Sequence, residues 1–124
     1  MHIDHVNIKA TAVLLEKVRN FYCHVLGLAE GFRPAFRDNG YWLYAGDTAI
    51  IHLSEVHDSP VSSRGTTFDH FAIRVMDLSG VIARLDAIDV AYSRYDLQDA
   101  GLTQLFFEDP AGNRVEVQCP DEQA

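Results

Sequence analysis

Cysteine is scarce in this sequence, and long apolar runs are missing. The chain of 124 residues has two cysteines, Cys23 and Cys119, and no Cys-x-x-C motif. Two cysteines cannot build the disulfide framework of a small secreted domain, and the missing motif argues against a zinc ribbon or a redox site. The apolar runs are far too short for a membrane span, and no basic segment followed by an apolar stretch marks a signal peptide. We therefore expect a cytoplasmic protein.

Basic residues are fewer than acidic ones. Ten Lys and Arg residues stand against 18 Asp and Glu residues, which gives a formal net charge of −8. Such a charge opposes binding to nucleic acid or to an anionic membrane surface, although it leaves room for a local cationic pocket. Hydrophobic residues make up 48% of the chain, which suffices for the core of one ordinary domain. We expect neither nucleic acid nor a membrane as a partner.

The chain contains an internal repeat. Ile3–Ile8 reads Ile-Asp-His-Val-Asn-Ile, and Phe68–Ile73, which lies 65 residues later, reads Phe-Asp-His-Phe-Ala-Ile. Both segments alternate between apolar and polar residues, which predicts a strand with one buried face. A helical pattern follows each strand, with Thr11 and Gly27 as start and stop signals of the first helix and Asp77 before the second.

Three short strands are predicted after each helix. They fall at Ala29–Arg33, Tyr41–Tyr44 and Thr48–Ser54 in the first copy, and at Ala91–Tyr95, Thr103–Phe107 and Arg114–Gln118 in the second. Turn residues separate them, among them Gly46 and Gly112. The patterns predict an α+β fold with two βαβββ modules, at about residues 2–55 and 68–119. A linker at about residues 56–67 joins them within a single domain of residues 1–124.

Four polar residues occupy matched positions in the two copies. His5 and His70 lie in the first strand of each module, and His52 and Glu116 lie in the last, on the face opposite the aliphatic side chains. A single histidine in a strand is more often a hydrogen-bonded structural residue than a ligand. Three imidazoles and a carboxylate at matched positions instead predict the ligand set of one divalent metal ion, with Fe, Zn, Ni, Co and Mn as candidates.

Two further motifs accompany the repeat. Phe21–Leu28 reads Phe-Tyr-x-x-Val-Leu-Gly-Leu, and Asp109–Glu116 reads Asp-Pro-x-Gly-Asn-x-x-Glu. With the doubled module and the Asp-His dipeptide in each copy, they resemble the vicinal oxygen chelate superfamily over Ile3–Gln118. That superfamily includes glyoxalase I, bleomycin-binding proteins and extradiol dioxygenases. The resemblance implies two half-open, mixed-sheet barrels and metal ligands on the first and last strands of each module. Those positions are occupied here by His5, His52, His70 and Glu116.

The resemblance leaves three functions open. The first is a glyoxalase-like lyase or isomerase that acts on a small oxygen-rich substrate, in which His52 and Glu116 are catalytic. Glyoxalase I usually has Glu or Gln where His52 stands, so His52 is either a metal ligand or a general base. The second is an extradiol ring-cleaving dioxygenase with Fe(II) held by His5, His70 and Glu116. The third is a small-molecule binding or bleomycin resistance protein without turnover.

Several cations and aromatic residues are candidates for substrate binding. Lys9 and Arg74 are repeat equivalents on the face of the histidines, and Arg114 shares the face of Glu116. With Arg33 and Trp42, they predict a pocket for an anionic substrate, although long cationic side chains at strand ends also reach water for no functional reason.

The resemblance also bears on assembly. Family members of about this length pair the first module of one chain with the second module of another. It therefore implies a homodimer whose metal sites lie between chains.

Overall fold

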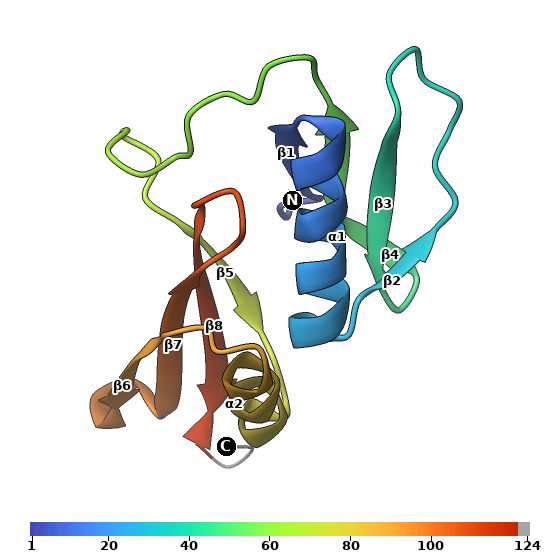
Figure 1. Ribbon diagram of the computed structural model, residues 1–124. Coiled ribbons are helices and arrows are strands. Elements are labelled where there is room, and N and C mark those ends of the chain that lie inside the picture. The colour runs from blue at the N-terminus through green and yellow to red at the C-terminus, as the bar shows by residue number, and fades with distance from the viewer. Residues whose placement is uncertain (122–124) are drawn as a thin grey trace. The chain divides into compact units, whose positions relative to one another are not determined.

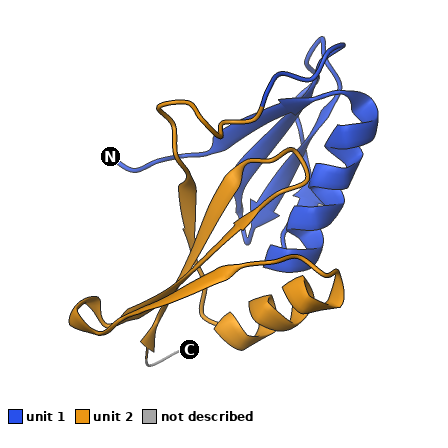
Figure 2. Ribbon diagram, turned by 60° about the vertical axis from the view of Figure 1, so that its left-hand side comes forward, with its two compact units in different colours: residues 1–61 blue, residues 62–124 orange. Residues whose placement is uncertain are grey.

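The chain divides into two compact units, Met1–Val61 and Ser62–Ala124 (Figure 2). The computed structural model describes residues 1–121. Each unit follows the order strand, helix, three strands (Figure 1). The expected α+β fold with two βαβββ modules is therefore confirmed. Within the described residues, neither helix has the length and apolar character needed to cross a membrane.

The first unit is a four-stranded sheet with one helix. Its elements are β1 (Val6–Ala10), α1 (Ala12–Leu26), β2 (Ala29–Gly31), β3 (Gly40–Ala45) and β4 (Thr48–Glu55). The strand order is β1-β4-β3-β2, in which β1 runs parallel to β4 and the other neighbours are antiparallel. The helix is capped by Gly27, whose φ of 69° is the left-handed conformation that glycine adopts without a steric penalty.

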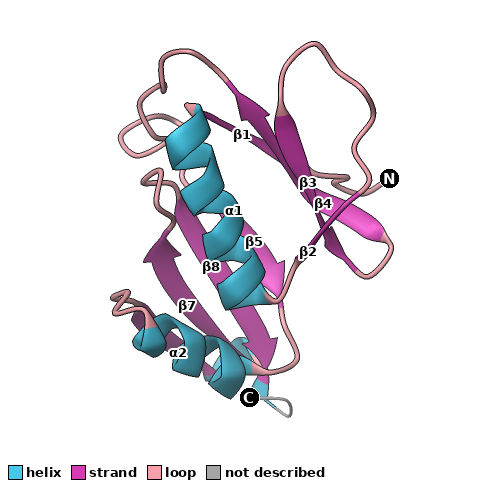
Figure 3. Ribbon diagram, turned by 45° about the vertical axis from the view of Figure 1, so that its right-hand side comes forward, coloured by secondary structure: helices cyan, strands magenta, loops and turns pink. Residues whose placement is uncertain are grey.

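The helix α1, drawn in cyan in Figure 3, packs against β1, β3 and β4. The helix and this sheet share one apolar core. The sheet contributes Leu43, Ile51 and Leu53, each with no exposed surface. The helix contributes the side chains at three- and four-residue spacing, namely Leu15, Val18, Phe21, Tyr22 and Val25. Burial of this apolar surface is the main stabilising contribution in the unit, and it commits the opposite face of the sheet to the polar residues.

The second unit repeats this arrangement. Its elements are β5 (Phe71–Arg74), α2 (Leu78–Ala87), β6 (Ser93–Leu97), the 3-10 helix η1 (Gln98–Ala100), β7 (Leu102–Glu108) and β8 (Arg114–Pro120). The strand order β5-β8-β7-β6 matches that of the first unit, with β5 parallel to β8. At the start of α2 the Asp77 side chain accepts a hydrogen bond from the Gly80 N–H, as an N-cap does.

The strand register places His52 and Glu116 at equivalent positions of the two sheets. Asn7 lies opposite His52 between β1 and β4, and Ala72 lies opposite Glu116 between β5 and β8. Because Asn7 and Ala72 are repeat equivalents, His52 and Glu116 occupy the same position in their sheets. The next strand likewise places Trp42 opposite His52 and Phe106 opposite Glu116.

Some strands begin or end at other residues than the sequence predicts. The strands β1 and β5 begin at Val6 and Phe71, so His5 and His70 precede them. A register shift between Leu43 and Tyr44 also leaves Ile50 without a partner on β3. Pairing of β1 with β4 begins at Val6, and pairing of β5 with β8 begins at the repeat-equivalent Phe71, although β7 and β8 pair without such a shift.

Candidate metal centre

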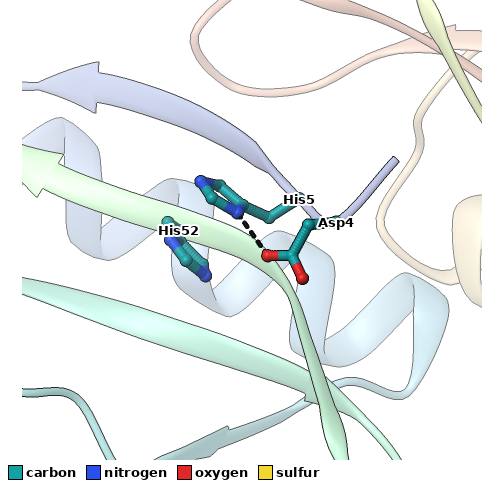
Figure 4. Close-up of side chains that lie close together, drawn as sticks. All are labelled: Asp4, His5 and His52. Atoms are coloured by element: carbon teal, nitrogen blue, oxygen red, sulfur yellow. Dashed lines mark hydrogen bonds and ion pairs between the residues drawn. The ribbon is translucent and has the colours of Figure 1, made fainter. Parts of the chain in front are cut away.

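In the first unit, His5 and His52 lie against each other (Figure 4). His5 stands just before β1 and His52 in β4, and their ring centroids are 3.7 Å apart with the planes at 12°. The Asp4 carboxylate accepts a hydrogen bond from His5 Nδ1 at 2.7 Å. Each of the three side chains has a ligand atom within 4.8 Å of the others, which makes this group a possible metal site.

The Asp4 carboxylate determines which His5 nitrogen can bind a metal. Because Nδ1–H donates to Asp4, the lone pair lies on Nε2. Metal-binding histidines in proteins usually have such a partner, which fixes the tautomer and increases the basicity of the ligand nitrogen. The pKa of Asp4 is lowered, chiefly by this hydrogen bond.

His52 is sandwiched between two rings. The Trp42 indole stacks on its other face, with centroids 3.9 Å apart and planes at 11°. The His52 side chain is buried, and its Nε2 lies 3.2 Å from the carbonyl oxygen of Ala49. Burial, and then the neighbouring His5, lower the pKa of His52, so this imidazole is neutral near pH 7.

The stacking restricts how the first pair can bind an ion. The lone pair of an imidazole lies in the plane of its ring, and one ion cannot lie in the planes of two parallel, stacked rings. His5 and His52 therefore bind one ion together only if one of the rings turns from the orientation seen here.

In the second unit, His70 and Glu116 point at each other. His70 Nε2 lies 3.0 Å from Glu116 Oε1, and His70 Nδ1 lies 2.6 Å from the Asp69 carboxylate. Two ligand atoms of one ion are about 3.0–3.4 Å apart when each metal–ligand distance is about 2.1 Å. The two side chains thus form a hydrogen bond, at a spacing that two ligands of one ion also have.

Glu116 is held from its other side by two amides. It is only 5% exposed, and its Oε2 accepts hydrogen bonds from Gln104 Nε2 at 3.1 Å and from Gln118 Nε2 at 3.4 Å. A buried carboxylate needs such donors, because an unpaired charge in the interior is costly. They also leave Oε1 directed at His70.

The candidate substrate residues are placed differently from one another. Arg114 donates through Nη1 to Asp69 at 2.8 Å, and Arg74 donates through Nε and Nη2 to Gln118 Oε1 at 3.0 and 2.6 Å. Trp42 stacks on His52, and Lys9 is exposed on β1. Arg33 instead donates to the Asp38 carbonyl oxygen and lines a separate cavity of about 480 Å³ beside the start of α1. The structure therefore brings Trp42, but not Arg33, to the His5–His52 pair.

Sequence reasoning missed the side-chain partners of three of the four candidate ligands. Asp4 and Asp69 orient His5 and His70, and Gln104 and Gln118 hold Glu116. The repeated Asp-His dipeptide was a usable signal for the two aspartates, since a carboxylate next to a histidine is a common partner of Nδ1. The two glutamines have no comparable signal, because their role depends on the pairing of β7 with β8.

Comparison with known proteins places the chain in a family. Solved structures that resemble it include a glyoxalase family protein from Bacillus anthracis, with 24% identity, 97% of this chain and 95% of that chain covered, and a TM-score of 0.76. A lactoylglutathione lyase from Agrobacterium tumefaciens has 19% identity, coverage of 95% and 92%, and a TM-score of 0.66. An antibiotic-binding protein from Streptomyces sp. CB03234 has 20% identity, coverage of 97% and 96%, and a TM-score of 0.69. These likenesses show a shared fold.

A search of curated proteins found no match. The sequence profile of one superfamily matches residues 2–117, and the chain belongs to that superfamily, the Glyoxalase/Bleomycin resistance protein/Dioxygenase superfamily.

Proposed function

We propose that the protein is a metal-dependent enzyme, a glyoxalase-like lyase or isomerase that acts on a small, oxygen-rich, anionic substrate. The metal ligands in this proposal are His5, His52, His70 and Glu116. The observation that carries it is the matched pair of Asp–His contacts, at 2.7 Å in the first unit and 2.6 Å in the second. A structural histidine does not require a carboxylate at the same position of both repeats, whereas a metal ligand gains from one.

The donor set fits a divalent transition metal. Three imidazoles and one carboxylate suit Fe, Zn, Ni, Co or Mn, and the 3.0 Å separation of His70 Nε2 and Glu116 Oε1 agrees with joint ligation. A bound ion would act as a Lewis acid that stabilises negative charge on two substrate oxygens.

His52 and Glu116 are the residues of the chain proposed to take part in the reaction. With Nε2 at the Ala49 carbonyl oxygen, His52 has its one lone pair on Nδ1, and that lone pair either binds the ion or accepts a proton from the substrate. Glu116 is kept in place by Gln104 and Gln118, so its Oε1 stays directed toward His70. Trp42 supports the His52 ring and limits its contact with water.

The surroundings of the His52 ring also favour a second candidate function. Its ring is stacked on both faces and one nitrogen lies at a backbone carbonyl, which suits a base better than a ligand. The remaining ligands, His5, His70 and Glu116, are the two histidines and one carboxylate typical of non-haem Fe(II) oxygenases. The second candidate is therefore an extradiol-type ring-cleaving dioxygenase.

The proposal extends to assembly. We propose a homodimer in which each metal site takes His5 and His52 from one chain and His70 and Glu116 from the other. The support is the family resemblance and the commonness of two-fold homodimers among soluble oligomers.

Elemental analysis of the purified protein tests the proposed metal site. We expect one tightly bound ion per chain, and we expect His70→Ala and Glu116→Ala to lose it. His57→Ala is the matched control, since His57 is exposed outside the strands and should keep its metal. A full metal complement in either His70→Ala or Glu116→Ala would contradict the assignment.

Metal identity and activity separate the candidate functions. Nickel, cobalt or zinc with turnover of hemithioacetals supports the lyase, and iron with oxygen consumption on catechols supports the dioxygenase. A metal-free protein that binds a small molecule tightly without turnover overturns both. The His52→Ala variant decides the role of His52, because a ligand variant loses metal and a base variant keeps metal but loses turnover.

A further inference from the structure

A cavity of about 490 Å³ lies in the second unit, at the start of β6 and along β7 and β8. Its charged lining residues are two arginines, Arg64 and Arg114, and one glutamate, Glu108. The remaining walls are aromatic or small and comprise Val90, Ala91, Tyr92, Ser93, Phe106 and Phe107. In a chain with a net charge of −8, a cavity lined by two arginines and one glutamate is a local excess of positive charge.

Arg114 is held in a fixed orientation in this cavity. Its guanidinium carbon lies 4.2 Å from the centre of the Phe106 ring, and its Nη1 donates to Asp69 at 2.8 Å. An arginine has five N–H donors in one plane, so the Asp69 contact leaves donors for a second acceptor. The Asp69 carboxylate accepts hydrogen bonds from both Arg114 and His70, so its negative charge does not neutralise Arg114 alone. A fixed guanidinium loses little side-chain entropy when it binds a ligand.

Arg64 offers a second, weaker anchored guanidinium. Its Nε lies 3.3 Å from Glu108 Oε1, with the two side chains 46% and 56% exposed. Exposed ion pairs of this kind contribute little to stability, and the terminal nitrogens of Arg64 carry four further N–H donors. A ligand carboxylate can therefore be accommodated without first breaking a strong interaction.

We propose that this cavity binds the carboxylate of an aromatic or similarly planar organic acid. Arg114 and Arg64 hydrogen-bond to the carboxylate, and Phe106 and Tyr92 contact the planar part of the ligand. Planar guanidinium groups match the geometry of a carboxylate, and aromatic walls favour a flat apolar body.

The cavity shares a wall with the candidate metal ligands. The Phe106 ring lies edge-on to the His70 ring, with centroids 5.3 Å apart, and Phe106 is opposite Glu116 in the strand register. If the proposed function holds, the substrate is an organic acid whose carboxylate occupies this cavity while its other oxygens reach the ion. This step rests on the proposed function, whereas binding of the acid itself does not.

Titration of the metal-free protein with benzoate tests the proposal, with the amide NMR shifts as the readout. We expect saturable shifts at Ala91, Tyr92, Glu108 and Arg114, and none from benzyl alcohol, which has the same ring without the charge. Arg64→Gln should weaken benzoate binding about tenfold, since a hydrogen bond to a charged group is lost. Arg94→Gln is the matched control, because Arg94 lies on β6, pairs with Asp96 and is not part of the cavity.

Three results would overturn the proposal: equal shifts from benzyl alcohol, unchanged benzoate affinity in Arg64→Gln, or shifts that map elsewhere. The test is independent of the proposed metal site, because it is done without metal. Arg64→Gln should also keep its metal, so a failed metal site and a failed acid site give different results.

Discussion

A carboxylate directly before His5 and another directly before His70 control which nitrogen of each imidazole is available. Asp4 and Asp69 both accept from Nδ1, so in both units Nε2 is the nitrogen left for another partner, which for His70 is Glu116 Oε1 at 3.0 Å. The two aspartates are the most specific feature of the candidate site, because they repeat with the histidines themselves.

Removing either aspartate should weaken metal binding without unfolding the protein. We expect Asp4→Ala and Asp69→Ala to lower metal affinity about 10- to 100-fold, as loss of such partners does in other metal sites. Competition with a chelator measures the change. Asp86→Ala, an exposed aspartate on α2, is the control and should bind metal as the parent does. Unchanged affinity in both test variants would show that the aspartates do not orient metal ligands.

The pKa of His52 gives a prediction for the metal-free protein. The folded pKa is lowered by burial and by His5, so the unfolded chain binds a proton more readily than the folded one. The stabilisation is present above the unfolded pKa of about 6.5 and is lost as the pH falls toward the lower folded pKa. Urea unfolding between pH 8 and pH 5 should show this loss, and His52→Gln should reduce it. An identical pH dependence in His52→Gln would contradict the prediction.

At the scale of the elements, the two helices begin differently. Asp77 caps α2 by accepting from the Gly80 N–H, and its pKa is lowered by this bond and by the Ser79 hydroxyl. Thr11 stands at the start of α1 without a hydrogen bond from its side chain to the helix. The second helix therefore depends on its cap residue more than the first does.

Replacement of the two cap residues tests this difference. Asp77→Ala should lower the melting temperature more than Thr11→Ala does. Because the folded pKa of Asp77 is lowered, its stabilisation is present above the unfolded pKa of about 3.9 and is lost as the pH falls below it. The effect of Asp77→Ala should thus shrink near pH 3. Thermal unfolding followed by circular dichroism measures both effects, and equal losses at pH 7 in the two variants would contradict the argument.

The elements show what local sequence patterns can predict. Alternation, helical periodicity and Gly27 predict the order of the elements and the end of α1. The four-residue ligand hypothesis requires the first and last strands of each module to be neighbours, and both parallel pairs are present. The bulge at Ile50 could not be predicted, because it arises from pairing between β3 and β4. The stack of Trp42, His52 and His5 likewise depends on strand register, which no short sequence segment encodes.

At the scale of the whole molecule, the two units are built alike and carry different donors. The first supplies two imidazoles and the second an imidazole and a carboxylate. A carboxylate carries a charge that an imidazole does not, which explains why Glu116 has amide donors around it while His52 has aromatic neighbours. The repeat thus preserved the positions and changed the chemistry at one of them.

The proposed homodimer makes a prediction about mixed subunits. If each site combines the first unit of one chain with the second unit of its partner, then His5→Ala and Glu116→Ala each damage every site of their own homodimer. A heterodimer of the two variants has one doubly damaged site and one intact site. Subunit exchange should therefore restore metal to about half of the sites in the heterodimers. Elemental analysis after exchange, with mass spectrometry to verify the heterodimer, measures the recovery.

A second mixture provides the control for subunit exchange. His5→Ala and His52→Ala both damage the first unit, so no heterodimer of these two variants has an intact site, and their mixture should recover no metal. Recovery in the first mixture and not in the second is the result expected only of sites shared between chains. Verified heterodimers of His5→Ala and Glu116→Ala that recover no metal, or a monomer that holds a full complement, would contradict the interchain arrangement. If all four ligands came from one chain, the heterodimers would recover no metal, because each variant would carry a damaged site of its own that no partner could repair.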